Sequence, residues 1–222
     1  AISQANELLD EDLVQPAQRR LTTMVQQNAE RLQQIVEDVL DIARAQGQAD
    51  AAEMHTLALD AETAAFCAEW VQQHRATPRV RVALNTPEVQ VQFAREHLRR
   101  ILVNLLDNAA RYASERAGAI QVATHAVRHG PAVLMVWSDG AAMEPAVRRH
   151  LFEPFFSSES RSSGLGLFIC RELCERHGAS VGYERTSREQ NGQIVEGNEF
   201  FVSFRRAHSG HLTFNLEDTQ FP

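Results

Sequence analysis

The sequence predicts an α+β protein in which helices cover one face of a mixed β-sheet, with an α-helical hairpin in front of it. The hairpin is predicted from an apolar seven-residue repeat within residues 17–46. The sheet is predicted because short alternating strands and helical segments are interleaved after residue 53. Turn residues alone separate several neighbouring strands, which indicates antiparallel pairs within the sheet.

The apolar repeat begins after Pro16, a residue that suits the first turn of a helix. Steps of four and three residues separate its positions, which are Leu21, Val25, Asn28, Leu32, Ile35, Val39 and Ile42, and the polar Asn28 interrupts the seam. One helix with so narrow a seam needs partners, and residues 1–11 read as the end of a second helix. We expect residues 1–46 to form a helical hairpin that builds a four-helix homodimer with a second chain, and residues 47–53 to be a linker.

The remaining elements are predicted within a catalytic domain at residues 54–206. Strands are expected at residues 55–59, 80–84, 89–91, 120–126, 133–137, 181–185 and 200–205, because apolar and polar residues alternate there. Helices are expected at residues 61–74, 94–113 and 165–177, the last of them closed by Gly178. The tail at residues 207–222 has alternating apolar residues that could add a strand to a sheet edge, although a mobile terminus is the commoner outcome.

The composition excludes several classes of protein. Of the 222 residues, 44% are hydrophobic and 23% are charged, as in ordinary globular proteins. No apolar run approaches the ~18 residues that span a bilayer and no signal-peptide pattern opens the chain, so a soluble piece is expected. A formal net charge of −7 argues against a nucleic-acid-binding surface. The chain contains arginine but no lysine, so contacts to phosphate are expected from arginine or from backbone amides.

The cysteines do not have the paired spacing of a disulfide framework, which indicates a reducing cytoplasm. There are three of them, Cys67, Cys170 and Cys174. Cys170, Cys174 and His177 recur at helical spacing and could hold a metal ion. Two small apolar side chains packed in a helix explain the same pattern and are the commoner case.

The helix predicted at residues 94–113 carries a polar face beside its apolar stripe. Asn104 and Asn108 lie one turn apart on that face, and Arg111 and Tyr112 follow them. Amide carbonyl oxygens suit a hydrated Mg²⁺, and a guanidinium group suits a polyphosphate. A solvated polar face would show the same pattern, so this helix alone leaves both interpretations open.

Three further segments contain candidate binding residues. Asp139 and Gly140 end an apolar strand, where the carboxylate can accept a hydrogen bond from the amino group of a base, although Asp-Gly is also an ordinary turn. Aromatic residues in 152–156 precede a serine-rich stretch up to Ser163, which predicts a hinged lid over a pocket. The segment 164–167, Gly-Leu-Gly-Leu, opens a helix at which backbone amides can approach phosphates.

In their order and spacing these segments resemble the histidine kinase branch of the Bergerat-fold ATPases. The matching segments are residues 104–109 for the N box, 139–140 for the first glycine box, 152–156 for the F box and 164–167 for the second glycine box. The predicted helical hairpin stands where this family has its dimerisation and phosphoacceptor domain. Residues 1–9 and 171–175 are most similar to the nitrogen-regulator-type kinases, and among these to the pilus-controlling PilS kinases.

The resemblance implies an enzyme that binds Mg-ATP and passes the γ-phosphoryl group to a histidine and then to an aspartate of a response regulator. Asn108 would ligate Mg²⁺, Asn104 would support the metal and the phosphates, and Asp139 would bind the adenine amino group. The ATP-binding residues that the resemblance implies are Asn104, Asn108, Arg111, Tyr112, Asp139, Gly140, Ala142, Met143, Phe156, Ser163, Gly164, Leu165, Gly166 and Leu167.

The partners implied are a second copy of the chain, through the helical hairpin, and the receiver domain of a response regulator. The resemblance also implies a cytoplasmic domain of an inner-membrane sensor protein, whose membrane contacts would be made by other parts of that protein. A nucleic-acid partner is not expected.

The sequence departs from the family pattern at three places. No histidine precedes His55, so the acceptor histidine is expected ahead of Ala1 and this chain is not expected to phosphorylate itself. The first glycine box is one residue short, and Ala142 replaces its second glycine. Ser162 and Ser163 stand where the family has Gly-Thr.

These departures leave an alternative open, a nucleotide-poor interaction module of the same fold that holds a response regulator or supports phosphatase activity. A free-standing ATPase of the same superfamily is a third reading, which the helical hairpin disfavours.

Overall fold

The computed structural model of the chain describes residues 18–26, 28–29, 32–33, 35–36, 53–128, 130–156, 163–190 and 192–207. Most of the predicted helical hairpin and linker, the lid residues 157–162 and nearly all of the tail lie outside these ranges. Residues 18–26 are helical, as expected for this part of the hairpin, and the hairpin as a whole stays a prediction.

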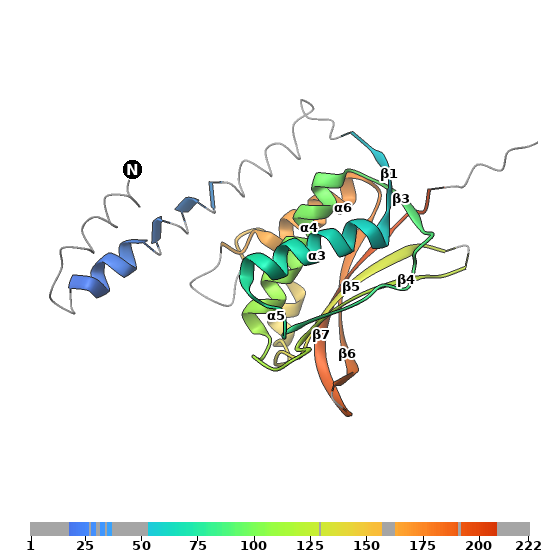
Figure 1. Ribbon diagram of the computed structural model, residues 1–222. Helices are drawn as coiled ribbons and strands as arrows, with labels where there is room; N and C mark the ends of the chain where they lie inside the picture. The colour runs from blue at the N-terminus through green and yellow to red at the C-terminus, as the bar shows by residue number, and fades with distance from the viewer. Residues whose placement is uncertain are drawn as a thin grey trace, which may run out of the picture.

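Strands and helices alternate along the rest of the described chain (Figure 1). The strands are β1 (His55–Ala58), β2 (Val80–Ala83), β3 (Gln90–Phe93), β4 (Ile120–Ala126), β5 (Ala132–Ser138), β6 (Ser180–Gln190) and β7 (Gln193–Phe204). The helices are α3 (Leu59–His74), α4 (Arg95–Tyr112), α5 (Pro145–Arg149) and α6 (Gly166–Arg176). Helix α5 was not predicted, because its 5 residues are too few to show a helical period. No helix in the described ranges has both the length and the apolar character needed to cross a membrane.

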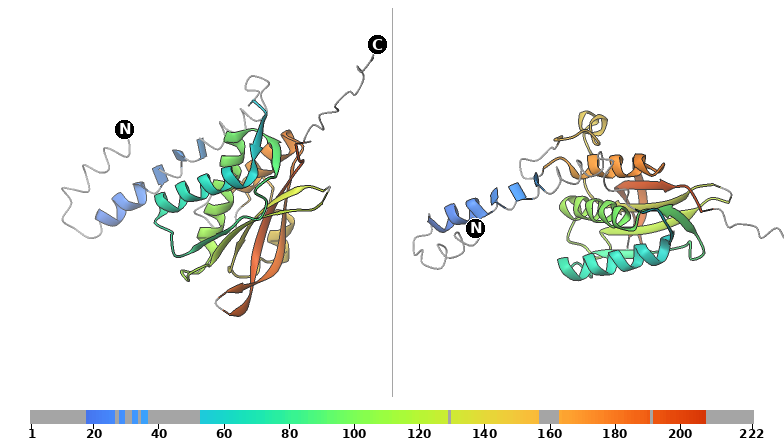
Figure 2. Two further views of the ribbon diagram at one scale, coloured as in Figure 1. Left: turned by 45° about the vertical axis from the view of Figure 1, so that its right-hand side comes forward. Right: turned by 90° about the horizontal axis from the view of Figure 1, so that it is seen from above.

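Five of the strands form one mixed sheet in the order β2-β4-β5-β7-β6. Strand β2 runs parallel to β4, and each other neighbouring pair in this sheet is antiparallel. Helices α3, α4 and α6 lie together over one face of the sheet (Figure 2). Strands β1 and β3 form a separate antiparallel pair. The predicted mixed sheet with helices on one face is therefore confirmed.

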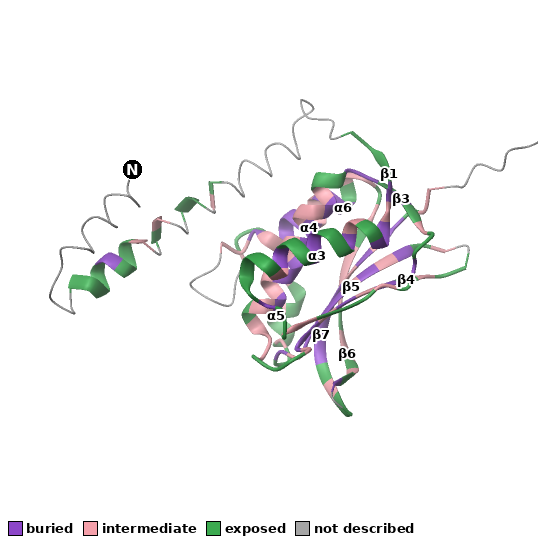
Figure 3. Ribbon diagram, in the orientation of Figure 1, coloured by how far each residue is buried: buried purple, intermediate pink, exposed green. Residues whose placement is uncertain are grey.

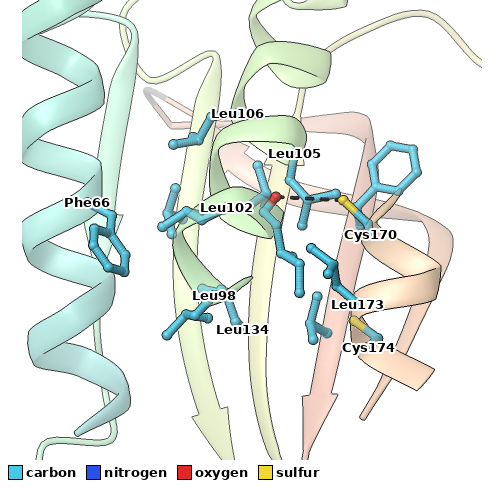
Figure 4. Close-up of a cluster of buried hydrophobic side chains, with 14 of the residues drawn as sticks. Phe66, Leu98, Leu102, Leu105, Leu106, Leu134, Cys170, Leu173 and Cys174 are labelled. Atoms are coloured by element: carbon cyan, nitrogen blue, oxygen red, sulfur yellow. Dashed lines mark hydrogen bonds between the residues drawn. The ribbon is translucent and has the colours of Figure 1, made fainter. Parts of the chain in front are cut away.

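The main core surrounds α4. Its apolar residues recur three and four positions apart, so one stripe of the helix is enclosed along its whole length. The side chains of Leu98, Leu102, Leu105 and Leu106 are 0% exposed. Figure 4 shows this stripe between Phe66 of α3 and the apolar side chains of α6. Buried residues concentrate where the helices meet the sheet, and the outward side of α3 is exposed (Figure 3). The core thus fixes α4 between two other helices and leaves its polar face for the site.

The β6–β7 hairpin is longer than predicted. The sequence predicted strands at 181–185 and 200–205 joined by a glycine-rich loop. The structure instead pairs the two strands as far as Gln190 and Gln193, across a turn in which Gly192 has a φ of 79°. The prediction was wrong because the intervening residues are mostly polar or charged, a composition that is typical of a loop.

These polar residues cover Trp137 on the sheet face opposite the helices. The indole is fully buried, and its Nε1 donates a hydrogen bond to the carbonyl oxygen of Thr186 at 3.3 Å. Gly197 lies flat on the ring, because a Cβ at this position would come within 2.2 Å of the indole. Glu199, the register partner of Trp137 on β7, forms an ion pair with Arg188. The hairpin residues therefore build a second, smaller cluster behind the sheet.

Candidate nucleotide-binding site

The polar face of α4 begins beside the first turn of α6. A Cβ placed on Gly166 would lie 3.5 Å from Oδ1 of Asn104, so the Asn104 amide adjoins the start of α6. The Nδ2 atom of Asn104 is buried, and the Asn104 side chain interacts with the Cys170 thiol of α6. A thiol is a weak acceptor, so this amide can also bind a ligand or a water molecule.

The same face continues along α4 to the end of β5. Asn108 is half-buried one turn after Asn104, and Arg111 is exposed. The main-chain oxygen of Tyr112 would lie 2.9 Å from a Cβ on Gly140, so the last turn of α4 packs on the residue that follows Asp139. The residues predicted from the N box and from both glycine boxes thus lie along one side of α4.

Gly164 brings the two ends of the predicted lid together. Its φ is 69°, and a Cβ on it would lie 2.7–2.8 Å from main-chain atoms of Phe155 and Phe156. No side chain fits in this space, and an L-residue would also be strained at this φ. The end of the F box and the start of the second glycine box are therefore in direct backbone contact, whereas the lid residues 157–162 lie outside the described ranges.

Asp139 is held in place by the segment that follows α4. Its Oδ1 accepts a hydrogen bond from the Ser114 backbone N–H at 2.8 Å, and its Oδ2 accepts one from Ser114 Oγ at 2.6 Å. The backbone N–H of Asp139 donates to the Ala119 carbonyl oxygen at 3.1 Å. An ionised carboxylate has about four acceptor positions, so two protein donors leave it able to accept from a base. Sequence reasoning missed Ser114, because a lone serine in a polar loop gives no signal.

Arg79, just before β2, holds the C-terminal end of α4. Its guanidinium donates hydrogen bonds of 3.1–3.2 Å to the carbonyl oxygens of Ala110, Ala113 and Ser114. Ala110 lies in the last turn of α4 and Ala113 is its C-cap, so their carbonyls have no partner within the helix, and a cation is favourable beside them. Arg79 also contacts the exposed carboxylate of Glu115 at 3.1 Å. Arg79 therefore fixes the segment that in turn holds Asp139. Sequence reasoning missed it because it is remote from every motif.

The other predicted site residues divide by burial. Gly140 and Leu165 are buried, and Ala142 is exposed. The half-buried residues are Met143, Phe156, Ser163, Gly166 and Leu167. The Oγ atom of Ser163 accepts a hydrogen bond from the Leu165 backbone N–H at 3.3 Å, just ahead of α6.

The alternative metal site at Cys170, Cys174 and His177 does not form. Both cysteines lie in the core, and burial raises the pKa of the Cys170 thiol to about 12 and that of Cys174 further still. His177 instead meets His97, with 2.6 Å between Nε2 and Nδ1. Across the described chain, no group of three His, Cys, Asp or Glu side chains could hold a metal ion. Two packed cysteines explain the helical spacing, as the commoner interpretation had it.

Comparison with known families identifies the class of protein. Residues 94–208 match the family described as histidine kinase-, DNA gyrase B- and HSP90-like ATPases. This range holds the polar face of α4, Asp139 and the start of α6. The chain belongs to this family.

Within the family, the relatives are sensor histidine kinases. The sensor protein kinase PilS of Pseudomonas aeruginosa is 33% identical over 196 residues, which cover 86% of this chain and 36% of PilS. A kinase/phosphatase, MprB of Mycolicibacterium smegmatis, is 37% identical over 93 residues, which cover 40% of this chain and 19% of MprB. The chain thus spans well under half the length of these curated relatives.

Solved histidine kinases have the same fold. Full-length ShkA in complex with AMPPNP superposes with a TM-score of 0.68 at 24% identity, over 93% of this chain and 42% of ShkA. AdeS of Acinetobacter baumannii superposes with a TM-score of 0.63 at 18% identity, over 91% of this chain and 92% of that chain.

Proposed function

We propose that this chain is the catalytic core of a two-component sensor histidine kinase, which binds Mg-ATP and transfers the γ-phosphoryl group to a histidine and on to a response-regulator aspartate. The observation that carries the proposal is the placement of the predicted polar residues and glycines along one side of α4. Asn104 adjoins α6 at one end, and Tyr112 packs against Gly140 at the other. A phosphate chain and a base held at these two ends would lie along the helix between them.

Each residue has a definite part in this proposal. The amides at the start of α6 and the guanidinium of Arg111 would bind phosphate oxygens. Asp139 would accept a hydrogen bond from the adenine amino group, while Ser114 keeps the carboxylate oriented. The γ-phosphoryl group would be positioned for a histidine outside this chain, and the domain would contribute positioning and charge neutralisation.

A magnesium ion fits this set of donors. Asn108 offers a carbonyl oxygen on the face that continues from Asn104, and Mg²⁺ in such sites commonly shares its coordination between one or two protein oxygens, phosphates and water. A protein cage of carboxylates is therefore not required. When bound, Mg²⁺ supplies neutralisation of the phosphate charge.

The domain organisation follows the same proposal. Residues 1–46 would form part of the dimerisation and phosphoacceptor hairpin, 47–53 a linker and 54–206 the catalytic domain. Of the apolar seam residues that the structure describes, Leu21 is 61% exposed, Val25 47% and Leu32 61%, and Ile35 is half-buried. A second copy would cover them, and sedimentation at increasing protein concentration should show a dimer. A chain that stays monomeric throughout would contradict this part of the proposal.

The remaining partners come from the sensor histidine kinases as a class. The phosphoryl group would pass to the receiver domain of a response regulator. The chain would act in the cytoplasm as part of an inner-membrane sensor protein.

The deciding experiment is calorimetric titration with a non-hydrolysable ATP analogue, with and without Mg²⁺, on the wild type and on Asn108→Ala. We expect binding that strengthens with Mg²⁺ in the wild type and a loss of that Mg²⁺ dependence in the variant. Removing one metal ligand should weaken binding about tenfold to a hundredfold, since second-shell changes alone commonly cost as much.

Asp107→Ala is a useful control, because Asp107 is also on α4 but accepts its hydrogen bond from Trp70 Nε1, away from the polar face. Its affinity for the analogue should stay close to that of the wild type once the folded fraction is taken into account. A folded wild type that binds no analogue at millimolar concentration would favour the interaction module, to which the shortened first glycine box points.

A further inference from the structure

The loop at residues 140–142, which follows Asp139, is held by side chains of the β6–β7 hairpin. Nδ2 of Asn198 donates a hydrogen bond to the carbonyl oxygen of Ala141 at 2.9 Å. Nη1 of Arg185 donates one to the carbonyl oxygen of Gly140 at 2.7 Å. Two successive carbonyls of this loop therefore have donors from a distant part of the chain.

The geometry around Asn198 fixes which way its amide points. Its Oδ1 accepts hydrogen bonds from the Tyr183 hydroxyl at 2.8 Å and from Arg185 Nη1 at 3.2 Å. The residue is only 2% exposed. With two donors on its oxygen, the amide must turn its nitrogen toward the loop. Asn198 thus acts as a fixed link between β6 and the Ala141 carbonyl.

The loop is also closed in from its other side. A Cβ on Gly140 would lie 2.9 Å from the Tyr112 carbonyl oxygen and 3.1 Å from Asn198 Nδ2. Gly140 is therefore held between the end of α4 and Asn198, with space for no side chain. Since Gly140 directly follows Asp139, any shift of this loop changes the position of the Asp139 main chain.

The two carbonyls differ in their surroundings. Gly140 is buried, so its carbonyl needs a protein donor, which Arg185 supplies. Ala141 is exposed, and Asn198 takes the place that water could have at its carbonyl. Arg185 also forms an ion pair with Glu196 at 3.8 Å. Because Glu196 is 74% exposed, this ion pair is too weak to explain the position of the Arg185 side chain.

We propose that Asn198 and Arg185 are positioning residues, which hold the loop 140–142 so that Asp139 can read the base of the bound nucleotide. The inference rests on the proposed nucleotide site and deepens it. Preorganisation of this kind raises affinity by removing the cost of ordering the loop on binding.

The test compares Asn198→Ala with Gln193→Ala, which removes an exposed amide from the same strand near the hairpin turn. Hydrogen exchange of a peptide spanning residues 139–143 is measured without nucleotide, and thermal unfolding confirms that both variants are folded. We expect faster exchange in Asn198→Ala and wild-type exchange in Gln193→Ala. Unchanged exchange in Asn198→Ala overturns the proposal, whether or not nucleotide binds.

The second measurement is the affinity of the same proteins for non-hydrolysable ATP and GTP analogues with Mg²⁺. We expect Asn198→Ala to weaken ATP-analogue binding about fivefold to tenfold and to lower the preference for ATP over GTP, with the Mg²⁺ dependence retained. A simple loss of stability would not change that preference.

Two outcomes separate the inference from the proposed function. If the wild type binds the ATP analogue and Asn198→Ala binds it equally well with equal preference, the positioning role is wrong and the nucleotide site stands. If the folded wild type binds neither analogue, the proposed function fails and the role in base reading fails with it.

Discussion

The two ends of the candidate site are built in different ways. At the proposed phosphate end, which lies beside Asn104 and Gly166, α4 and α6 pack side by side. The residues that adjoin this end belong to these helices or directly precede them. At the base end, Ser114 holds the Asp139 carboxylate, and Arg79, Arg185 and Asn198 donate to backbone carbonyls of the adjoining segments. These residues are far apart in the sequence. One end is assembled from two neighbouring helices, and the other from long-range contacts.

The difference shows where sequence changes can be absorbed. At the phosphate end Gly164 is in backbone contact with Phe155 and Phe156, so there is no space for a side chain at this position. At the base end the loop 140–142 is held by Asn198 and Arg185, which reach it from the sheet, so its conformation does not depend on its own residues alone.

The largest effect is expected from Arg79→Met, which tests the long-range support of the base end. The change removes the donor to three carbonyls at the end of α4, and the Arg79 side chain is only 17% exposed. Urea unfolding should show a loss of about 2–3 kcal/mol in the free energy of unfolding. Arg81→Met is the matched control, because Arg81 is exposed on the adjoining strand β2. An equal, small loss of stability in both variants would contradict the role of Arg79 in holding the end of α4.

Gly164→Ala tests the backbone contact at the phosphate end. An alanine must adopt a φ of 69° and also place its methyl group within van der Waals overlap of the Phe155–Phe156 backbone. Gly192→Ala is the control, because Gly192 has a φ of 79° but nothing within 4 Å of its would-be Cβ. We expect a loss of about 2 kcal/mol in unfolding free energy for Gly164→Ala and about 1 kcal/mol for Gly192→Ala. Only the former should weaken Mg-nucleotide binding, as calorimetry can show.

Ser114→Ala separates the two ends by their binding properties. The variant loses the hydroxyl donor to Asp139 and keeps the backbone donor. Loss of a hydrogen bond to a carboxylate costs about 1.5 kcal/mol, which sets the upper limit of the effect, so the preference for an ATP analogue over a GTP analogue should fall by at most about tenfold. The Mg²⁺ dependence of binding, a property of the phosphate end, should not change. A variant that lost the Mg²⁺ dependence while keeping the base preference would reverse the assignment of the two ends.

The smallest effect is expected from His177→Gln, which lies in neither end of the site. Burial, and then the nearby His97 and Arg176, lower the pKa of His177 from 6.5 to about 4. The unfolded chain therefore binds a proton below pH 6.5 that the folded chain does not take up until about pH 4. Stability is lost as the pH falls through this window, and the loss stops below it.

Because the ring is partly exposed, the loss should be on the order of 1 kcal/mol. Urea unfolding at pH 7 and at pH 4 should show a smaller loss in His177→Gln than in the wild type. Nucleotide affinity at pH 7 should be the same in both proteins. Equal losses in the two proteins would show that His177 does not titrate in this window.

The contrast between the two ends also explains what could be predicted from the sequence. The polar face of α4 and the glycines before α6 repeat at helical spacing or adjoin one another, so a local pattern identifies them. Most strand and helix positions were predicted for the same reason. Arg79, Ser114 and Asn198 act across long sequence separations, and an isolated arginine, serine or asparagine has no period to reveal it.

The β6–β7 hairpin was misjudged for a related reason. Its outer half is polar because it pairs Arg188 with Glu199 and covers Trp137, not because it is a loop. Alternation of apolar and polar residues identifies strands that face a single core. It fails where the second face of a sheet is covered by the charged side chains of its own hairpin.

The burial of Trp137 gives the chain an optical probe of its own. The protein has only two tryptophans, and both Trp70 and Trp137 are enclosed. In a Trp70→Phe background the remaining emission would come from the indole that lies against Gly197 and Thr186. The wavelength and quenching of that emission would then report how closely the hairpin packs on the sheet. The position of β7, the strand that carries Asn198, could thus be monitored by intrinsic fluorescence, without any added label.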